Sequence, residues 1–423
     1  MASLVSTDRL VVGATAVTVA LLPLQEGVLP GNVAPVDPFI VVAFVVMLLW
    51  AGWTRPRLHL PYALPVGMLV ATGTLAALLG SYPLTGGLAV SQDLFLLAWG
   101  VVIANVAARP EGLSTVLRVW AYSAVAWALV LAAVFSLHLW TLAGVDLTQG
   151  TRAALTFGDQ NTAALYFALS LAVVLAAKRP RRPVARFVAV VLILYALVLT
   201  GSLSGFLGLA VALAVAAFVS IRRRHGMAAA MMAITLLTAA AGGAFMVATS
   251  DQLAQRASGS QNSLIKDSIG RGHQSSSERE VLASETTALY FQSHLVGLGA
   301  NATYDTLVAE QASYTPHGTH NDFIAAIVER GVLGEIALLV LVGAIAVRSI
   351  ALGGRALPGV AGREVPAPGY LLGAVVSLVV FTATHEILHD RNVWTLLGLV
   401  AALYLWIRNS GEADGHRAEA VSP

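Results

Sequence analysis

The chain has 423 residues, of which 57% are hydrophobic and only 11% are charged, and its formal net charge is +2. These values exclude an ordinary soluble domain and indicate a polytopic membrane protein. The small net charge does not favour nucleic acid as a partner. The absence of cysteine excludes disulfides, thiol nucleophiles and thiolate metal sites.

Apolar runs long enough to cross a bilayer follow one another up to residue 249 and resume after residue 320. We predict an all-α polytopic integral membrane protein with about twelve transmembrane helices. The run after Arg9 is interpreted as a retained helix, because no clear small-residue cleavage site follows it. The predicted spans are 10–28, 37–54, 60–80, 87–107, 116–138, 160–177, 186–201, 203–221, 226–248, 331–352, 368–388 and 393–408.

The pattern divides the chain into four parts. Residues 1–249 hold spans one to nine, residues 250–319 form a large polar loop, and residues 320–408 hold spans ten to twelve. Residues 409–423 are predicted to form a disordered cytoplasmic tail.

Basic residues predict the orientation of the chain. With a cytoplasmic N-terminus, the short loops that contain Arg55, Lys178, Arg223 and their basic neighbours all face the cytoplasm. The short outer loops keep only Arg152 and Arg391. The positive-inside rule therefore places both termini in the cytoplasm and the large loop outside the cytoplasmic membrane.

The outer loop is predicted to be partly helical. Ser277 stands three residues before Glu280, which is the spacing of a capping box, so a helix should begin near Glu278 and carry Arg279 in its first turn. The glycine-rich stretch at 297–304 predicts a turn.

A second capping box marks the end of the loop. Thr319 stands three residues before Asp322, just ahead of an apolar run, so His320 and Asn321 should lie in the first turn of a helix. A helix N-terminus attracts anions and favours a neutral imidazole. Beside a phosphate group, His320 would therefore be a suitable general base near neutral pH. Alternatively, it is only a polar residue at the membrane surface.

Arginines reach the same outer face from several elements. Arg152, Arg271, Arg279 and Arg391 could bind phosphate oxygens through paired hydrogen bonds, as a lipid-linked diphosphate requires. Alternatively, individual arginines extend toward the membrane surface or pair with Asp146, Asp159, Glu329 or Asp390.

Two further patterns keep other functions open. His385, Glu386 and His389 fit H-E-x-x-H, which on a helix presents two imidazoles to zinc as in a membrane metalloprotease. The third ligand would have to be His317 or His320, because the downstream acids fall across the bilayer. Asp93 and Glu335 lie near span ends, where acids can serve a transporter. We predict no metal and no cofactor.

Three motifs occur in order after residue 150. The stretch Arg152–Asn161 contains R and T-F-G-x-x-N, Arg279 precedes a G-x-G turn at 297–299, and His320-Asn321 is followed after nine residues by Gly331–Gly334, G-x-x-G. In these motifs the sequence resembles the bacterial O-antigen ligase and O-antigen polymerase-like membrane glycosyltransferases. It departs from them at Leu203, where the family usually carries an arginine.

The resemblance implies a GT-C-like membrane enzyme that transfers a glycan from an undecaprenyl diphosphate carrier to an acceptor hydroxyl, with inversion and without a metal. His320 would be the general base, and Arg279, helped by Arg152 or Arg271, would stabilise the departing diphosphate. The prenyl chain would lie between spans, with the loop helix as a lid. Further predicted substrate-binding residues are Asn161, His317, Asn321 and Arg391.

Overall fold

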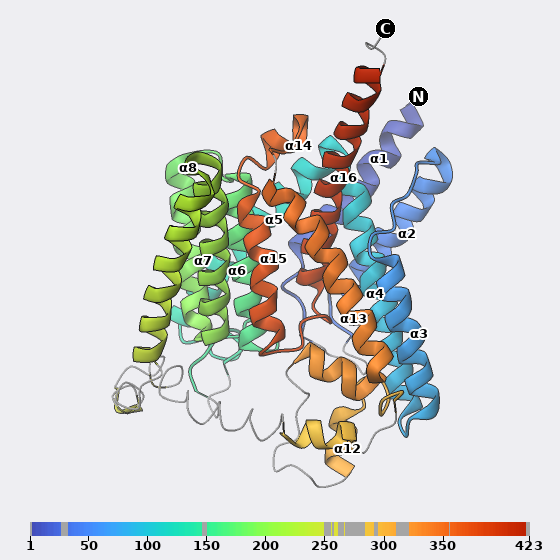
Figure 1. The fold of residues 1–423 in the computed structure, drawn as a ribbon, viewed down its shortest axis with the longest axis vertical. Coiled ribbons are helices and arrows are strands. Elements are labelled where there is room, and N and C mark those ends of the chain that lie inside the picture. The colour runs from blue at the N-terminus through green and yellow to red at the C-terminus, as the bar shows by residue number, and fades with distance from the viewer. Residues whose placement is uncertain are drawn as a thin grey trace.

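The computed structural model describes residues 2–26, 33–145, 150–248, 255, 258–260, 266, 284–291, 295–309, 321–354 and 356–419, with the backbone alone for 2–6, 237–248 and 411–419. In these residues the chain forms an upright bundle of α-helices, with α12 lying outside one end of it (Figure 1). The all-α class predicted from the sequence is confirmed.

The observed helices follow the predicted spans closely. Most boundaries agree within a few residues, and the predicted spans at 203–221 and 226–248 both fall within α8. The bounds are α1 Ala2–Ala20, α2 Asp37–Thr54, α3 Ala63–Leu79, α4 Pro83–Ala107, α5 Pro110–Ser136, α6 Gln160–Ala177, α7 Pro183–Thr200, α8 Leu203–Ala248, α12 Thr303–Ala309, α13 Asp322–Gly354, α14 Gly359–Glu364, α15 Gly369–Thr382 and α16 Arg391–Glu419.

Eight of the described helices are long and apolar enough to cross a membrane, and α3 and α15 are shorter apolar helices. The chain is therefore a polytopic membrane protein, whereas the number of twelve spans stays a prediction. The last helix, α16, continues to Glu419, whereas a disordered tail was expected from residue 409 onward. Alanine and glutamate in this segment favour helix, which explains the continuation.

One long helix contains a reversal of the chain. At Gly226 the backbone of α8 adopts φ 87° and ψ 177°, which is not helical. Figure 1 shows the two halves of α8 meeting at the end of the bundle where both chain termini lie. The two halves thus correspond to two of the predicted spans.

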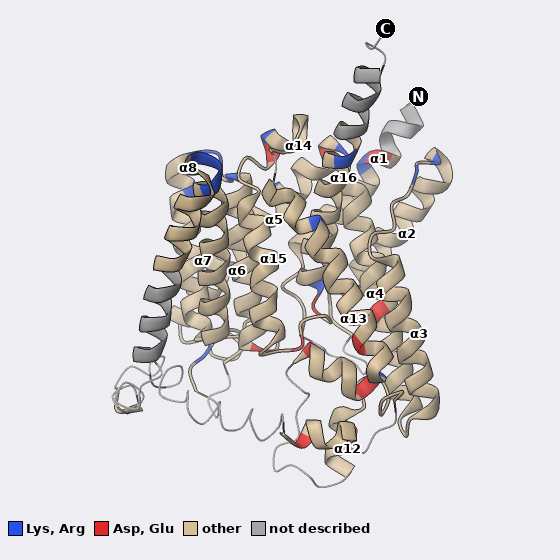
Figure 2. Ribbon diagram, viewed as in Figure 1, with Lys and Arg blue, Asp and Glu red and all other residues tan. Residues whose placement is uncertain are grey.

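Charge separates the two ends of the bundle. Lysine and arginine gather at the end of the bundle that carries the two termini. They lie at the turn of α8 and on the parts of α14 and α16 at that end (Figure 2). The starts of α6 and α13, together with α12, lie at the other end. This arrangement is what the positive-inside rule requires of a chain with both termini on one side.

Two enclosed helices, α6 and α16, set the interior of the bundle. The indole of Trp120 on α5 donates to the Ser170 hydroxyl on α6 at 3.0 Å, and that of Trp99 on α4 donates to Thr395 on α16 at 2.8 Å. Between spans, where both sides are apolar, such hydrogen bonds and close packing hold the helices together. Helix α15 packs against α6 and α8, so the connection between α15 and α16 lies near the start of α6.

Helix α13 is interrupted at Gly331, the first glycine of the G-x-x-G motif. Gly331 has φ 67°, and the helix resumes after it. The broken turn is completed by the loop: Leu298 N–H donates to the Val328 carbonyl at 2.9 Å, and Val332 N–H donates to the Leu295 carbonyl at 3.2 Å. Irregular backbone near a membrane needs such partners. The predicted turn is confirmed, because Gly297 and Gly299 both have positive φ.

We expect Gly331→Ala to lower the free energy of unfolding by at least about 1–3 kcal/mol, because a residue with a Cβ is strained at this φ. A Cβ at this position would also lie 1.9 Å from the Leu295 carbonyl oxygen. The control is Gly343→Ala in the same helix, where an added Cβ meets nothing within 4 Å. Thermal unfolding of the two purified variants in one detergent measures the difference, and equal melting temperatures would contradict a break at Gly331.

Candidate functional site

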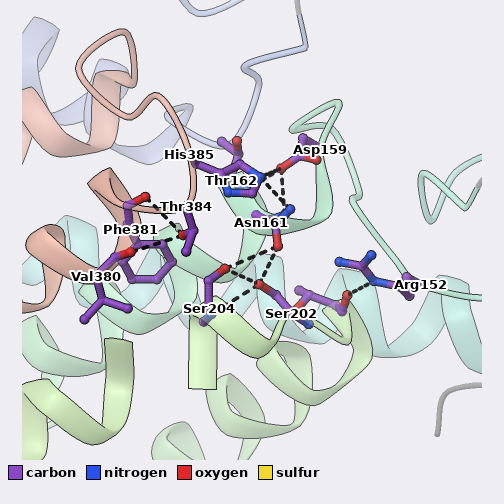
Figure 3. Close-up of polar contacts among 12 residues, drawn as sticks. Arg152, Asp159, Asn161, Thr162, Ser202, Ser204, Val380, Phe381, Thr384 and His385 are labelled. Carbon is purple, nitrogen blue, oxygen red and sulfur yellow. Dashed lines mark hydrogen bonds and ion pairs between the residues drawn. The ribbon is translucent and has the colours of Figure 1, made fainter. Parts of the chain in front are cut away.

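A polar cluster forms where α6 begins and α7 gives way to α8. Asp159 is the N-cap of α6, and its Oδ1 accepts from the backbone N–H of Asn161 at 2.7 Å and of Thr162 at 3.0 Å. The cap satisfies donors that the first turn of a helix leaves without intrahelical partners. It also fixes Asn161 in the first turn of α6, next to Asp159 (Figure 3).

Asn161 joins three elements of the bundle. Its Oδ1 accepts from the Ser202 hydroxyl at 2.6 Å, and its Nδ2 lies 2.7 Å from Nε2 of His385 (Figure 3). An amide nitrogen donates, so His385 Nε2 is the acceptor in this contact, and Asp159 Oδ1 lies 3.8 Å from the same nitrogen. Asn161 therefore links the start of α8 to the connection between α15 and α16.

The start of α8 explains why serines stand at 202 and 204. Ser202 caps the helix by accepting from Gly205 N–H at 3.2 Å, and its hydroxyl lies 3.0 Å from that of Ser204. Both side chains are buried. The hydroxyls therefore serve the helix start and Asn161 together.

Arg152 lies beside this turn. Its Nε donates to the Thr200 carbonyl at 3.2 Å, and Ala153 N–H donates to the Leu199 carbonyl at 3.0 Å. Leu203, which replaces the family arginine, is half exposed and follows Thr200 by three residues. A guanidinium group is thus present at this turn, but it comes from the segment ahead of α6.

The capping residue of α13 differs from the predicted one. Asn321 is the capping residue, since its Oδ1 accepts from Phe323 N–H at 2.9 Å and Ile324 N–H at 3.2 Å. The helix begins at Asp322, so the cap is two residues later than the predicted cap at Thr319. The asparagine side chain can bond both N–H groups, which explains the shift. A role for the Asn321 carboxamide oxygen in substrate binding would compete with this capping.

Four predicted residues lie outside the described residues. They are the proposed base His320, the proposed cation Arg279, and the substrate-binding candidates Arg271 and His317. Their roles stay predictions.

Asp322 ties the start of α13 to the connection between α15 and α16. Its two carboxylate oxygens accept from Ile387 N–H at 3.0 Å and Leu388 N–H at 3.3 Å, and its side chain is almost fully buried. The connection has no regular structure of its own, so these bonds satisfy backbone groups that would otherwise be buried without partners. As a result, the helix start that follows His320 in the sequence lies against residues 383–390.

The H-E-x-x-H sequence is not helical. Helix α15 ends at Thr382 and α16 begins at Arg391, so His385, Glu386 and His389 lie in the connection between them. The pairing of two imidazoles on one helix face, which the zinc hypothesis required, is therefore wrong. Asp322 and the short turns at 385 and 390 hold this segment out of a helix. In the part of the chain that the structure describes, no three potential ligands lie close enough to hold a metal ion.

A polar cavity of about 140 Å³ opens between these elements. Its walls combine Asn161 and Phe381 with the α15–α16 connection, from His385 to Asp390. Burial raises the pKa of the Asp390 carboxyl to about 6, although a bond from Asn392 N–H lowers it in part. The cavity therefore offers hydroxyl, amide, imidazole and carboxyl groups, which suits a ligand rich in hydroxyls.

Arg391 lines the same cavity but is held by an acid. Its Nε donates to Asp37 Oδ1 at 2.9 Å, and one Nη donates to Asp37 Oδ2 at 2.7 Å. The pair is buried, and the paired geometry is the strong one for a guanidinium and a carboxylate. This favours a supporting role for Arg391, in place of the predicted direct contact with substrate. Sequence reasoning did not consider Asp37 as its partner.

A second ion pair holds the loop side of the site. Arg330 donates to Asp93 at 2.6 Å and to the Leu69 carbonyl at 3.2 Å. The neighbouring Glu329 accepts from Asn301 N–H at 2.7 Å and Thr303 Oγ1 at 2.8 Å. The ion pair with Arg330 explains why an acid stands at position 93 inside a span. The transporter hypothesis had not included this partner.

The structure thus brings together some predicted residues and adds others. Asn161 and Arg391 line one cavity, and Arg152 lies at the turn beside Asn161. Ser202 and Asp322 were not predicted as parts of this cluster, whereas His385 was expected, with His389, as a polar residue at a helix end that faces the same cavity. The clustered hydroxyls at 200–204 were the available signal for Ser202, whereas nothing in the sequence linked Asp322 to residues 387 and 388.

The fold and this cluster define a polytopic membrane protein with a polar site at one end of its helical bundle. Residues 188–339 match the family described as O-antigen ligase, which confirms the resemblance to that family. The match covers the G-x-G turn and the H-N-x9-G-x-x-G motif, whereas Arg152 and Asn161 lie before it. The match suggests glycan transfer in polysaccharide assembly. No curated protein matches the chain.

We expect Asp322→Ala to loosen the α15–α16 connection. The change leaves two buried N–H groups without their acceptor, at about 1–3 kcal/mol each. Hydrogen exchange at Ile387 and Leu388 should accelerate about ten-fold or more, because local opening becomes easier. The control is Asp305→Ala, since Asp305 accepts from Thr85 at the same end of the bundle but does not contact this connection. Unchanged exchange at both amides in Asp322→Ala would refute the anchoring role.

Proposed function

We propose that the protein transfers a glycan from an undecaprenyl diphosphate carrier to an acceptor hydroxyl at the outer face of the cytoplasmic membrane, as an O-antigen ligase-like enzyme or a surface-polysaccharide polymerase. The observation that carries the proposal is the family match over residues 188–339. The position of the helix start after His320, against a polar cavity, supports it.

The distribution of charge supports the outer location. The start of α6, which carries Asn161, lies at the end of the bundle opposite the basic loops (Figures 1 and 2). Lys- and Arg-rich loops stay in the cytoplasm, so the cavity would face the outside. Lipid-linked glycans presented on that side would reach it directly.

An apolar groove supports a lipid-linked donor. A cavity of about 210 Å³ lies between α13, α15 and α16, and its walls are almost entirely aliphatic, from Leu338 and Val342 to Val375. Ile387 and Leu388 close the groove at the connection that Asp322 anchors. A prenyl chain in this groove would bring its diphosphate to the polar end without leaving an apolar environment.

The proposed reaction needs one base and at least one cation. The acceptor oxygen attacks the anomeric carbon as its proton passes to the His320 imidazole. The bond from the anomeric carbon to the diphosphate oxygen breaks, and inversion follows from attack on the opposite face. Arg279, with Arg152 or Arg271, stabilises the charge that develops on the departing diphosphate. No metal is required in this scheme.

The described polar groups would bind and orient the sugars. Asn161 and His385 meet at 2.7 Å on one wall of the cavity, and the carboxyl of Asp390 lies in the same lining. These groups can donate to and accept from sugar hydroxyls. Asn321 and His317 would contribute from the start of α13 and the segment before it.

We expect His320→Ala to reduce transfer by about 100-fold or more, since a positioned general base contributes 10²–10⁴. Cells whose own gene is deleted and that express only the variant should accumulate the lipid-linked glycan. Extraction and mass spectrometry of the lipid fraction measure this accumulation. The control is His225→Ala, because His225 is exposed near the basic turn of α8. Normal membrane insertion of the His320→Ala variant together with full transfer would remove the assignment.

We also expect a chelator to leave transfer unchanged, because a histidine base and arginines supply the chemistry. Membranes that contain the protein are treated with EDTA, the EDTA is washed out, and glycan transfer is compared with that of untreated membranes. Loss of transfer that zinc restores would overturn the metal-independent mechanism.

A further inference from the structure

A cavity of about 470 Å³ lies at the end of the bundle that carries the basic loops. Its walls come from the end of α2 and the segment after it, the junction of α4 and α5, the start of α14 and residues 405–410 of α16. None of its lining residues takes part in the transfer proposed above. The role of this cavity therefore needs a separate explanation.

The lining is basic and aromatic. Arg57, His59 and Arg109 contribute the charged or ionisable groups, and Trp50 and Trp406 contribute two indoles. None of the described lining residues is acidic. Such a lining attracts an anion that also has an apolar part.

Arg109 is fixed by two contacts that leave some of its guanidinium N–H groups without a partner among the described residues. One Nη donates to Asp8 at 2.7 Å, and the guanidinium carbon lies 4.5 Å from the centre of the Trp50 ring. Its Nε and second Nη are buried and have no hydrogen-bond partner among the described residues. Buried guanidinium N–H groups normally find an acceptor, so these two groups are available to an anionic oxygen.

The opposite wall is also fixed. The buried side chain of Asn105 accepts from His59 N–H at 2.9 Å and donates to the His59 carbonyl at 2.8 Å. This pair of bonds sets the backbone that carries Arg57 at the mouth of the cavity. Burial lowers the pKa of His59 below its ordinary value, with a smaller effect from Arg408, so the imidazole is neutral at pH 7.

We propose that this cavity binds the headgroup of an anionic glycerophospholipid. Arg57 and Arg109 bind the phosphate oxygens, and the glycerol and upper acyl chains lie against Trp50, Trp406 and Leu405. A lipid is favoured over a soluble phosphate because most of the wall is apolar. The exposed Trp53 indicates the membrane interface at this level. Basic pockets near the cytoplasmic surface are known to take acidic headgroups.

The test compares retained lipid in native mass spectrometry of the full chain released from nanodiscs of phosphatidylglycerol and phosphatidylcholine. The wild type should retain one phosphatidylglycerol molecule. Arg57→Gln should lower that affinity about five-fold, in line with one cation at a membrane surface. Arg57→Lys should keep most of it. Arg109→Gln is a weaker test, because loss of the Asp8 and Trp50 contacts can unfold this end.

The matched control is Arg55→Gln, which removes the same charge from the same loop at an exposed residue that does not line the cavity. It should retain phosphatidylglycerol as the wild type does. Equal retention by Arg57→Gln and wild type, or equal losses in Arg55→Gln and Arg57→Gln, would overturn the proposal. Full displacement of the lipid by millimolar glycerol phosphate would assign the site to a soluble phosphate, and so would also overturn it.

Discussion

The carboxylate of Asp322 is the contact on which the outer end of the bundle depends. The α15–α16 connection is irregular backbone between two spans, and such backbone is stable near lipid only when its polar groups have partners inside the protein. Asp322 accepts from two of its N–H groups and is itself the first residue of α13. One side chain therefore fixes the helix start after His320 to the segment from His385 to Asp390, and that segment forms one wall of the polar cavity.

The two ends of the bundle have different chemistry. The end away from the basic loops gathers amide, hydroxyl, imidazole and carboxyl groups around Asn161, and an apolar cavity lies beside the same α15–α16 connection. The other end gathers guanidinium groups and indoles around a larger cavity. The first combination suits a glycan on a lipid carrier, and the second suits an acidic headgroup of the surrounding membrane. Both proposals follow from charges and apolar walls that meet at a membrane surface.

The glycines of the family motif have a plain structural explanation. Gly331 breaks α13 at positive φ, and the loop at 295–299 supplies hydrogen bonds to the broken turn. Glu329 and Arg330, the two residues before the break, then bind the start of α12 and Asp93 on α4. The motif is thus a junction at which the described end of the large loop joins the spans, and the first turns of α13 connect that junction to the helix start that follows His320.

The sequence by itself determined the class, most of the helix boundaries and the separation of charge between the two ends of the bundle, because span length and loop charge are local properties of a chain in a bilayer. It placed α1 too late and began α13 too late, at residues 10 and 331. It also found the G-x-G turn and the cluster residue Asn161. Only the tertiary structure decided the partners: Asp37 for Arg391, Asp93 for Arg330, and Ser202 and His385 for Asn161. It also showed that H-E-x-x-H is a bent connection, since the bonds from Asp322 that hold it come from a residue far away in the sequence. Periodicity and spacing carry no information about such distant pairs, which depend on how the helices pack.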